Sequence, residues 1–163
     1  MPIRVGGGDV SLIRTIDAMP TLADSLEEQG IGLVAAYMLT PRVDDLASLV
    51  TFERRGFRPR ATALILNLAK ADTPTAFDAV RRHPVYKEAI ARGAVEIWMP
   101  ELSQGVSLRI ERARVQFREA RDGLAPAGRK PASISLLERV EVREFLERQA
   151  SEFLPIEGWM PWT

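Results

Sequence analysis

The sequence has 163 residues, 46% of them apolar and 27% charged, which are ordinary values for one globular domain with a core. Lys plus Arg equals Asp plus Glu at 22 each, so no global field attracts nucleic acid or a membrane surface directly. The absence of Cys excludes disulfides, thiolate chemistry and cysteine metal sites. No apolar stretch reaches the roughly 18 residues of a membrane span, and the N-terminus has no signal-peptide core. We expect a soluble, cytoplasmic protein.

Short apolar runs alternate with helical patterns along the first hundred or so residues. The runs predict strands at 3–5, 31–39, 61–66 and 94–99. Each predicted helix has a start signal or a terminal glycine. The starts are Thr40 with Pro41, Thr75 and Pro84, and the ends are Gly30, Gly56 and Gly93. Because single helices connect successive strands, we expect parallel pairing with right-handed crossovers.

The pattern changes after Pro100. It predicts one long helix at 106–121, a Pro/Gly/Ala linker at 124–131, and a last helix that begins at Ser133 or Ser135. The predicted fold is α/β: a mostly parallel sheet of about four strands flanked by helices, with two C-terminal helices. We expect a single domain over 1–163, with the sheet and its crossover helices at 1–100, the C-terminal helices at 101–154 and a tail at 155–163.

Asn67 closes the third apolar run and is the first candidate site residue. An unbroken run of small and aliphatic residues is typical of a strand covered on both faces. Open parallel sheets bind ligands just outside the carboxyl ends of their strands. The Asn amide offers donors and an acceptor, which suits the edge of a planar base. The alternative is an ordinary strand-end Asn that caps the next turn.

A glycine triplet, Gly6 to Gly8, lies with Asp9 between the first predicted strand and a helix. Glycines there let backbone N–H groups approach a phosphate, and the helix N-terminus favours an anion. The alternative is that Asp9 is simply the N-cap of that helix. The sequence contains no Gly-x-x-x-x-Gly-Lys-Ser/Thr and no Gly-x-Gly-x-x-Gly, which argues against a usual triphosphate loop and a standard dinucleotide fold.

The glycine turn, Asn67 and the Met-Pro-Glu-Leu stretch at 99–102 occur in an order that resembles the later part of the ParA/MinD-like P-loop NTPases. The segment 76–88 is also similar to that family, and the resemblance covers roughly residues 3–154. It is closest to ATPases encoded with plasmid-partition or conjugative-transfer genes. The resemblance implies that Gly7 and Gly8 sense the terminal phosphate of ATP, that Asn67 hydrogen-bonds the adenine, and that Pro100 lines the base pocket. It also implies magnesium as a cofactor and dimerisation as the switch.

The departures from that family bear on activity. The phosphate-binding loop and its strand have no counterpart in these 163 residues, and we expect that the sequence begins too late to contain them. The stretch Ile3–Val5 lacks the acid that family members place near Mg²⁺. The Lys that bridges phosphates and the hydroxyl that holds Mg²⁺ are also missing. Phosphoryl transfer depends on these groups for its charge stabilisation. We therefore expect a truncated or degenerate relative with no catalytic residues and no ATPase activity of its own.

Two other classes of function stay open. A non-catalytic interaction module would use the C-terminal helices and the tail with Trp159 and Trp162, because aromatic residues dominate interface energetics. An unrelated small α/β enzyme is the third possibility, although no nucleophile–base pair stands out. His83, the only His, is expected to cap a helix or lie at the surface. The alternating charges of the two C-terminal helices indicate solvated faces, so nucleic acid is expected as an indirect partner at most.

The missing phosphate-loop strand predicts a gap in the sheet. In P-loop folds of this kind that strand lies between the strand before the glycine turn and the next strand in the sequence. Without it, we expect residues 1–8 to be poorly ordered or displaced, because a stub at 3–5 is too short to hold its register. The edge of Ile31–Leu39 would then be a template for another chain, so a homodimer or another protein partner is expected.

Overall fold

The computed structural model describes residues 14, 17–19, 21–57, 59–71, 73–124 and 134–159. The chain divides into two compact units, residues 1–98 with 155–163 and residues 99–154. Each unit has its own cluster of buried apolar side chains. Within the described ranges, no helix is both long and apolar enough to cross a membrane.

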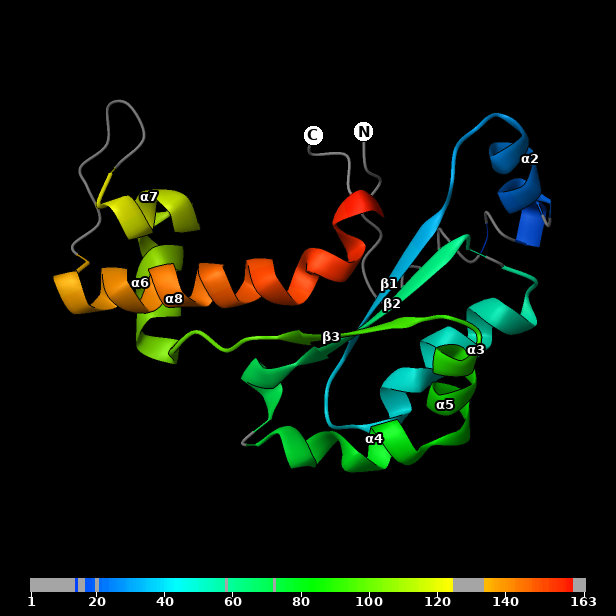
Figure 1. Cartoon of the computed structure of the whole chain (residues 1–163), viewed down its shortest axis with the longest axis horizontal. Coiled ribbons are helices and arrows are strands. Elements are labelled where there is room, and N and C mark those ends of the chain that lie inside the picture. Colours follow the sequence, from blue (N-terminus) through cyan, green and yellow to red (C-terminus); the bar gives the residue numbers. More distant parts are fainter. Residues whose placement is uncertain are drawn as a thin grey trace. The chain divides into compact units, whose positions relative to one another are not determined.

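A three-stranded parallel sheet organises the first unit (Figure 1). Its strands lie in the order β1 (Val34–Leu39), β2 (Ala61–Asn67) and β3 (Val95–Met99). β1 and β2 pair in parallel from Val34 opposite Ala61 to Leu39 opposite Leu66. The predicted α/β fold with a parallel sheet is confirmed, but the described sheet has three strands where about four were expected. The remaining candidate strand, 3–5, lies outside the described residues, as does the predicted displacement of 1–8.

The burial of the strands follows their sequences. In β2 the four residues at 63–66 are all buried, as an unbroken apolar run predicts. β1 alternates instead, with Val34 and Met38 exposed and Leu39 buried. β1 also begins later than the predicted Ile31, because the Ile31 N–H donates to the carbonyl of Leu26 and belongs to the end of the preceding helix.

Helices connect the strands in the expected alternation. α2 (Leu22–Glu28) precedes β1. The helical segments between the strands are η1 (Val43–Asp45), α3 (Leu46–Arg54), η2 (Leu68–Lys70), η3 (Pro74–Phe77), α4 (Asp78–Arg82) and α5 (Pro84–Ala91). The three predicted terminal glycines are confirmed. Gly30, Gly56 and Gly93 follow α2, α3 and α5 with φ of 76°, 80° and 96°, a left-handed conformation that costs glycine little.

The predicted helix start at Thr40 and Pro41 is wrong. The helical turn begins only at Val43, because Arg42 is extended with φ −101° and ψ 126°. Thr40 is a donor and not a capping acceptor: its backbone N–H and its hydroxyl both donate to Oδ2 of Asp45, at 2.7 and 2.6 Å. The sequence pattern identified the turn, but it predicted Thr40 as the hydrogen-bond acceptor, whereas the acceptor is Asp45.

The next two predicted starts have different outcomes. The cap before η3 is Thr73, so Thr75 lies inside the turn and its assignment as a cap is wrong. Pro84 does begin α5, as predicted. His83 is the N-cap of that helix, and its Nδ1 accepts from the Val85 N–H at 3.3 Å. The expected capping role of His83 is therefore confirmed.

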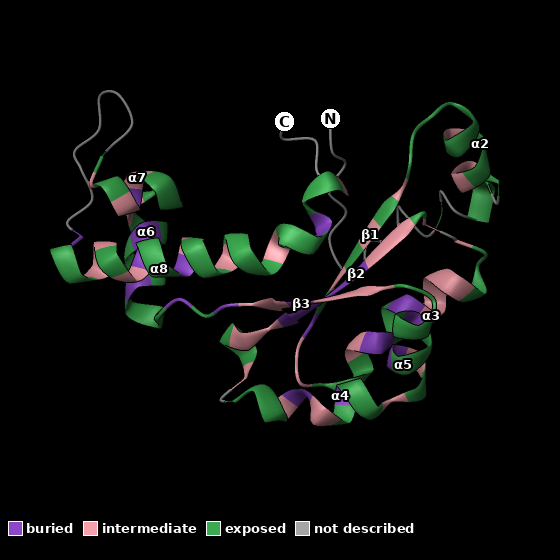
Figure 2. Cartoon of the chain, viewed as in Figure 1, coloured by how far each residue is buried: buried purple, intermediate pink, exposed green. Residues whose placement is uncertain are grey.

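The core of the first unit lies between the sheet and the helices that connect its strands. Figure 2 shows buried residues on β2 and on parts of α3, α4 and α5. Phe77 is fully buried and meets the Trp98 ring edge-on, with ring centroids 5.6 Å apart. The other buried members are Leu39, Leu46, Leu49, Leu64, Leu66, Val80, Tyr86 and Ala89. This cluster fixes α4 and α5 against β3.

The second unit contains α6 (Gln104–Ala113), α7 (Phe117–Asp122) and α8 (Leu136–Phe153). The single helix predicted at 106–121 is wrong, because the chain breaks at Arg114, which has φ 52° and ψ 41°. A capping box between Gln116 and Glu119 then starts α7. Val115 lies in the break and is buried, which gives the turn a packing role. Neither Gly nor Pro marks this break in the sequence.

α8 begins after Ser135, one of the two predicted starts. The Ser135 N–H donates to the Glu138 carboxylate at 2.8 Å, and the Ser135 hydroxyl accepts from the Glu138 N–H at 3.4 Å. Among the apolar residues of α8, Phe145 is buried, but Leu136 and Leu137 are 76% and 81% exposed. The chain continues into η4 (Leu154–Trp159), where Ile156 is buried; Trp162 lies outside the described residues.

Candidate functional site

Asn67 is the last residue of the central strand β2, so it lies at the carboxyl end of the sheet, as predicted. It is half-buried, and its Oδ1 accepts from the Ala69 N–H at 3.0 Å. This contact makes Asn67 the N-cap of η2, which is the capping role given as the alternative. The bond orients the amide and uses one acceptor position of Oδ1. It does not involve the two N–H donors of Nδ2.

The other predicted site residues have different positions. Pro100 is buried and follows Met99, the last residue of β3. β3 is the neighbour of β2, which agrees with the pairing expected of successive strands. Pro100 belongs to the second unit, and its place in a base pocket stays a prediction. Gly7 and Gly8 lie outside the described residues.

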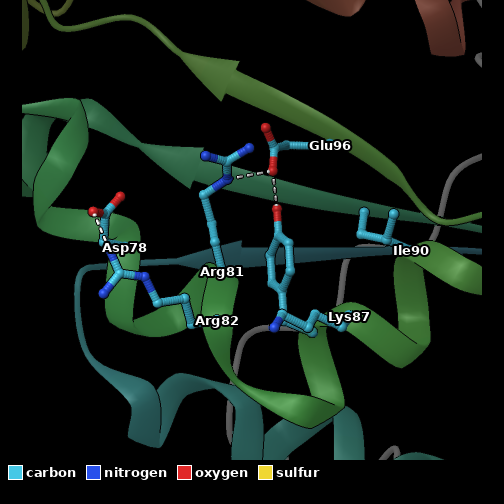
Figure 3. Close-up of a pocket in the computed structure, with 7 residues that line it drawn as sticks. Asp78, Arg81, Arg82, Lys87, Ile90 and Glu96 are labelled. Carbon is cyan, nitrogen blue, oxygen red and sulfur yellow. Dashed lines mark hydrogen bonds and ion pairs between the residues drawn. The ribbon is translucent and has the colours of Figure 1, made fainter.

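A separate cavity of about 550 Å³ lies among α4, α5 and β3 (Figure 3). Sequence reasoning did not identify it. Charged side chains dominate its lining, with one tyrosine and one aliphatic residue. The lining residues are Asp78, Arg81, Arg82, Tyr86, Lys87, Ile90 and Glu96.

Glu96 organises this cavity. Its Oε2 accepts from Arg81 Nε at 2.9 Å and from the Tyr86 hydroxyl, and its Oε1 accepts from Trp98 Nε1 at 3.0 Å. Glu96 and Trp98 lie two residues apart on β3 and therefore point to the same face of the sheet. Arg81 comes from α4 and Tyr86 from α5. One carboxylate thus connects two helices to the strand.

Arg81 is held from two directions. Besides the bond from Nε to Glu96, its guanidinium carbon lies 5.7 Å from the centroid of the Trp98 ring. The hydrogen bond to Glu96, followed by the charge of Glu96, raises the pKa of Arg81. A guanidinium fixed by a carboxylate and an aromatic ring is already in place for a further partner.

The pKa of Tyr86 is raised, first by burial and then by the hydrogen bond to Glu96 and the charge of Glu96. The phenol therefore stays protonated and acts as a hydrogen-bond donor. It is not available as a base near neutral pH. Together with Glu96, which accepts from three donors, Tyr86 gives the cavity a fixed polar wall, which suits binding better than proton transfer.

The two tyrosines of the chain predict a loss of stability at alkaline pH. Burial, with a smaller effect of Glu53, raises the pKa of Tyr37 to about 12, and the pKa of Tyr86 is also raised. Unfolded tyrosine has a pKa of about 10, so the unfolded chain releases its phenol protons first. This contribution to stability is complete below about pH 10 and is lost as the pH rises through the folded pKa values. Urea midpoints should fall above about pH 10, and Tyr37→Phe should reduce that fall. An equal fall in the variant would contradict the assignment.

One feature of the sequence could have revealed this cluster. Glu96 is a charged residue within the apolar run 94–99, and a carboxylate in a buried strand needs partners. The Arg81-Arg82 pair upstream offered them. Which arginine reaches Glu96, and that Tyr86 joins it, depends on how α4 and α5 pack on β3. The spacing of residues along the sequence does not predict how these helices pack on the strand.

A second hollow, of about 440 Å³, lies near the amino ends of β2 and β3. Arg92 forms ion pairs there with Glu53 and, at 2.8 Å, with Glu88. Both partners of this cation are on the surface helices α3 and α5. Ligands of open parallel sheets bind at the carboxyl ends, so this hollow is at the wrong end for that mode.

Within the part of the chain that the structure describes, no three His, Asp or Glu side chains come together in a group that could hold a metal ion. Comparison with protein-family models, with curated proteins and with solved structures gave no match.

Proposed function

We propose that this chain is a nucleotide-binding α/β domain of the ParA/MinD type that does not hydrolyse ATP on its own. The observation that carries the proposal is the position of Asn67. It ends the central strand of a parallel sheet, and the Ala69 N–H orients its amide. Carboxyl strand ends are where open parallel sheets bind ligands, and an oriented amide is the group that reads a base edge.

The family resemblance supplies the proposed roles of the site residues. The Nδ2 group of Asn67 would donate to a ring nitrogen of adenine. The hydrogen bond from the Ala69 N–H to Oδ1 would keep the amide from rotating. For Pro100 the resemblance implies a place in the lining of the base pocket, and for Gly7 and Gly8 it implies contact with the terminal phosphate. In a protein of this type the bound nucleotide would favour a dimer that serves plasmid partition or transfer.

Within the described residues, no three acidic or His side chains form a group that could hold a metal ion by themselves. The sequence also contains no Gly-x-x-x-x-Gly-Lys-Ser/Thr to hold the phosphates. We therefore expect no phosphate release by the purified chain above background. A turnover that survives further purification and disappears in Asn67→Ala would overturn this expectation.

Asn67→Asp tests the base contact. Aspartate still caps η2 by accepting from the Ala69 N–H, so the fold should persist, but the two Nδ2 donors are lost. Calorimetry with adenosine avoids repulsion between the new carboxylate and a phosphate. We expect adenosine affinity to fall about tenfold, because an unpaired base acceptor costs about 1–3 kcal/mol.

Gln29→Glu is the matched control, since it makes the same amide-to-acid change at an exposed residue that follows α2. It should leave adenosine binding unchanged. Absence of adenosine and ATP binding by the unaltered chain, or equal affinities for it and Asn67→Asp, would contradict the proposal.

The interaction module is the second candidate, and the exposure of Leu136 and Leu137 on α8 favours it. Aliphatic side chains that are 76% and 81% exposed suit a protein contact. Trp159 in the tail is half-buried and supports the same interpretation less strongly. The calorimetric experiment separates the two candidates, because an interaction module needs no nucleotide.

A further inference from the structure

We propose that the cavity among α4, α5 and β3 binds a singly charged carboxylate that carries a small apolar group. This proposal is independent of the nucleotide proposal, because none of the seven residues that line the cavity takes part in the predicted nucleotide site. A failure of one proposal therefore leaves the other standing.

The charge of the lining favours an anion. Arg81, Arg82 and Lys87 provide three positive charges, and Asp78 and Glu96 provide two negative ones, so the lining carries one net positive charge. In a chain with equal numbers of acidic and basic residues, this excess is local. A ligand with one negative charge would neutralise it.

The two acids of the lining are already engaged. Glu96 accepts from Arg81, Tyr86 and Trp98, and Asp78 accepts from Arg82 at 2.9 Å. A cationic ligand would have to compete with these bonds. The acids therefore position the cations, and the cations are the groups that meet the ligand.

The cations keep donors for an anion. Arg81 bonds Glu96 through Nε, and Figure 3 shows its two terminal nitrogens beyond that bond. Among the described residues, Arg82 bonds only Asp78, and it does so through Nη2. Lys87 forms no ion pair with any described residue. A guanidinium has five N–H donors in a planar fork, which matches the two oxygens of a carboxylate.

The position of Arg81 lowers the entropic cost of binding. An exposed arginine loses rotamer freedom when it grips a ligand, but here Glu96 and the Trp98 ring already restrict the side chain. The Tyr86 ring and Ile90 provide the apolar part of the lining. A carboxylate with a compact aryl or branched aliphatic body would contact both parts of the cavity.

Sodium benzoate is the probe, added to the full chain at constant ionic strength and followed by NMR of the backbone amides. We expect saturable shifts at residues 78–90 and at Glu96. Benzamide has the same ring without the charge and should cause no saturable shift there. Inorganic phosphate tests the anion class and should bind more weakly than benzoate.

Two exposed cations can be removed without disturbing Glu96. Arg82→Gln combined with Lys87→Gln should weaken benzoate binding about tenfold, the sum expected from two solvent-exposed charge contacts. Arg81→Lys keeps the charge but loses the fork and should also weaken binding. Arg54→Gln, at an exposed residue of α3 away from the cavity, is the matched control and should have no effect.

Three outcomes would overturn the proposal. They are equal shifts with benzamide and benzoate, benzoate affinity that is unchanged in the double variant, and tighter binding of inorganic phosphate than of benzoate. The last outcome would identify a phosphate site in place of a carboxylate site.

Discussion

Leu64→Ala is expected to lower the free energy of unfolding by about 2–5 kcal/mol. Leu64 is fully buried in the middle of β2, the central strand, and belongs to the core of the first unit. Removing its side-chain methyl groups costs their transfer free energy and leaves a cavity that a close-packed sheet cannot fill by relaxation. Urea unfolding followed by circular dichroism and tryptophan fluorescence measures the change.

Leu137→Ala is the matched control, because it makes the same substitution at a side chain that is 81% exposed. A surface change of this kind shifts stability by about 0.5 kcal/mol or less. If the two variants unfold at the same urea concentration, the burial of β2 is not what stabilises the first unit, and the description of the core is wrong.

Glu96→Ala is expected to lower the free energy of unfolding by about 2 kcal/mol, since it removes a carboxylate that accepts from three donors. The Tyr86 hydroxyl and the Trp98 indole N–H would lose their partner, and Arg81 would lose its ion pair. The Glu96 side chain is 23% exposed, so water can replace only part of these bonds.

A second readout separates this effect from simple loss of packing. Without the hydrogen bond and charge of Glu96, the pKa of Tyr86 should fall toward its ordinary value. The ultraviolet absorbance of the phenolate reports this directly, with Tyr37 as an internal reference. Glu88→Ala is the control, because Glu88 is 70% exposed and, among the residues that the structure describes, forms its one ion pair with Arg92. An unchanged Tyr86 titration in Glu96→Ala would contradict the role of Glu96.

Local signals predicted much of the first unit. The unbroken apolar run identified β2, Pro84 identified the start of α5, and the terminal glycines marked the ends of α2, α3 and α5. Each of these features depends on residues that are adjacent in sequence. A glycine after a helix and a proline at its first turn have physical effects that need no tertiary partner.

The features that were missed depend on contacts between distant residues or on rare conformations. Arg114 takes a left-handed conformation that non-glycine residues seldom adopt, so nothing in the pattern indicated the break between α6 and α7. Thr40 donates to Asp45, where the pattern predicted that it would accept. The Glu96 cluster requires α4, α5 and β3 to meet, which a linear pattern does not specify.

The same distinction applies to the site. The sequence alone placed Asn67 at the carboxyl end of a strand, because an apolar run that stops at a polar residue marks a strand end. Its capping bond to Ala69 agrees with the local alternative. The contact to a base rests on that position and on the family resemblance.

Asn67 is the only asparagine in the sequence, which makes the base contact directly measurable. A sample labelled with the nitrogen isotope in asparagine alone gives one pair of side-chain NH2 cross-peaks, which share one nitrogen frequency and belong to Nδ2 of Asn67. We predict that adenosine moves this pair of cross-peaks in a saturable manner and that benzoate leaves it in place. An Asn67 side-chain signal that does not move with adenosine or ATP would contradict the proposed function.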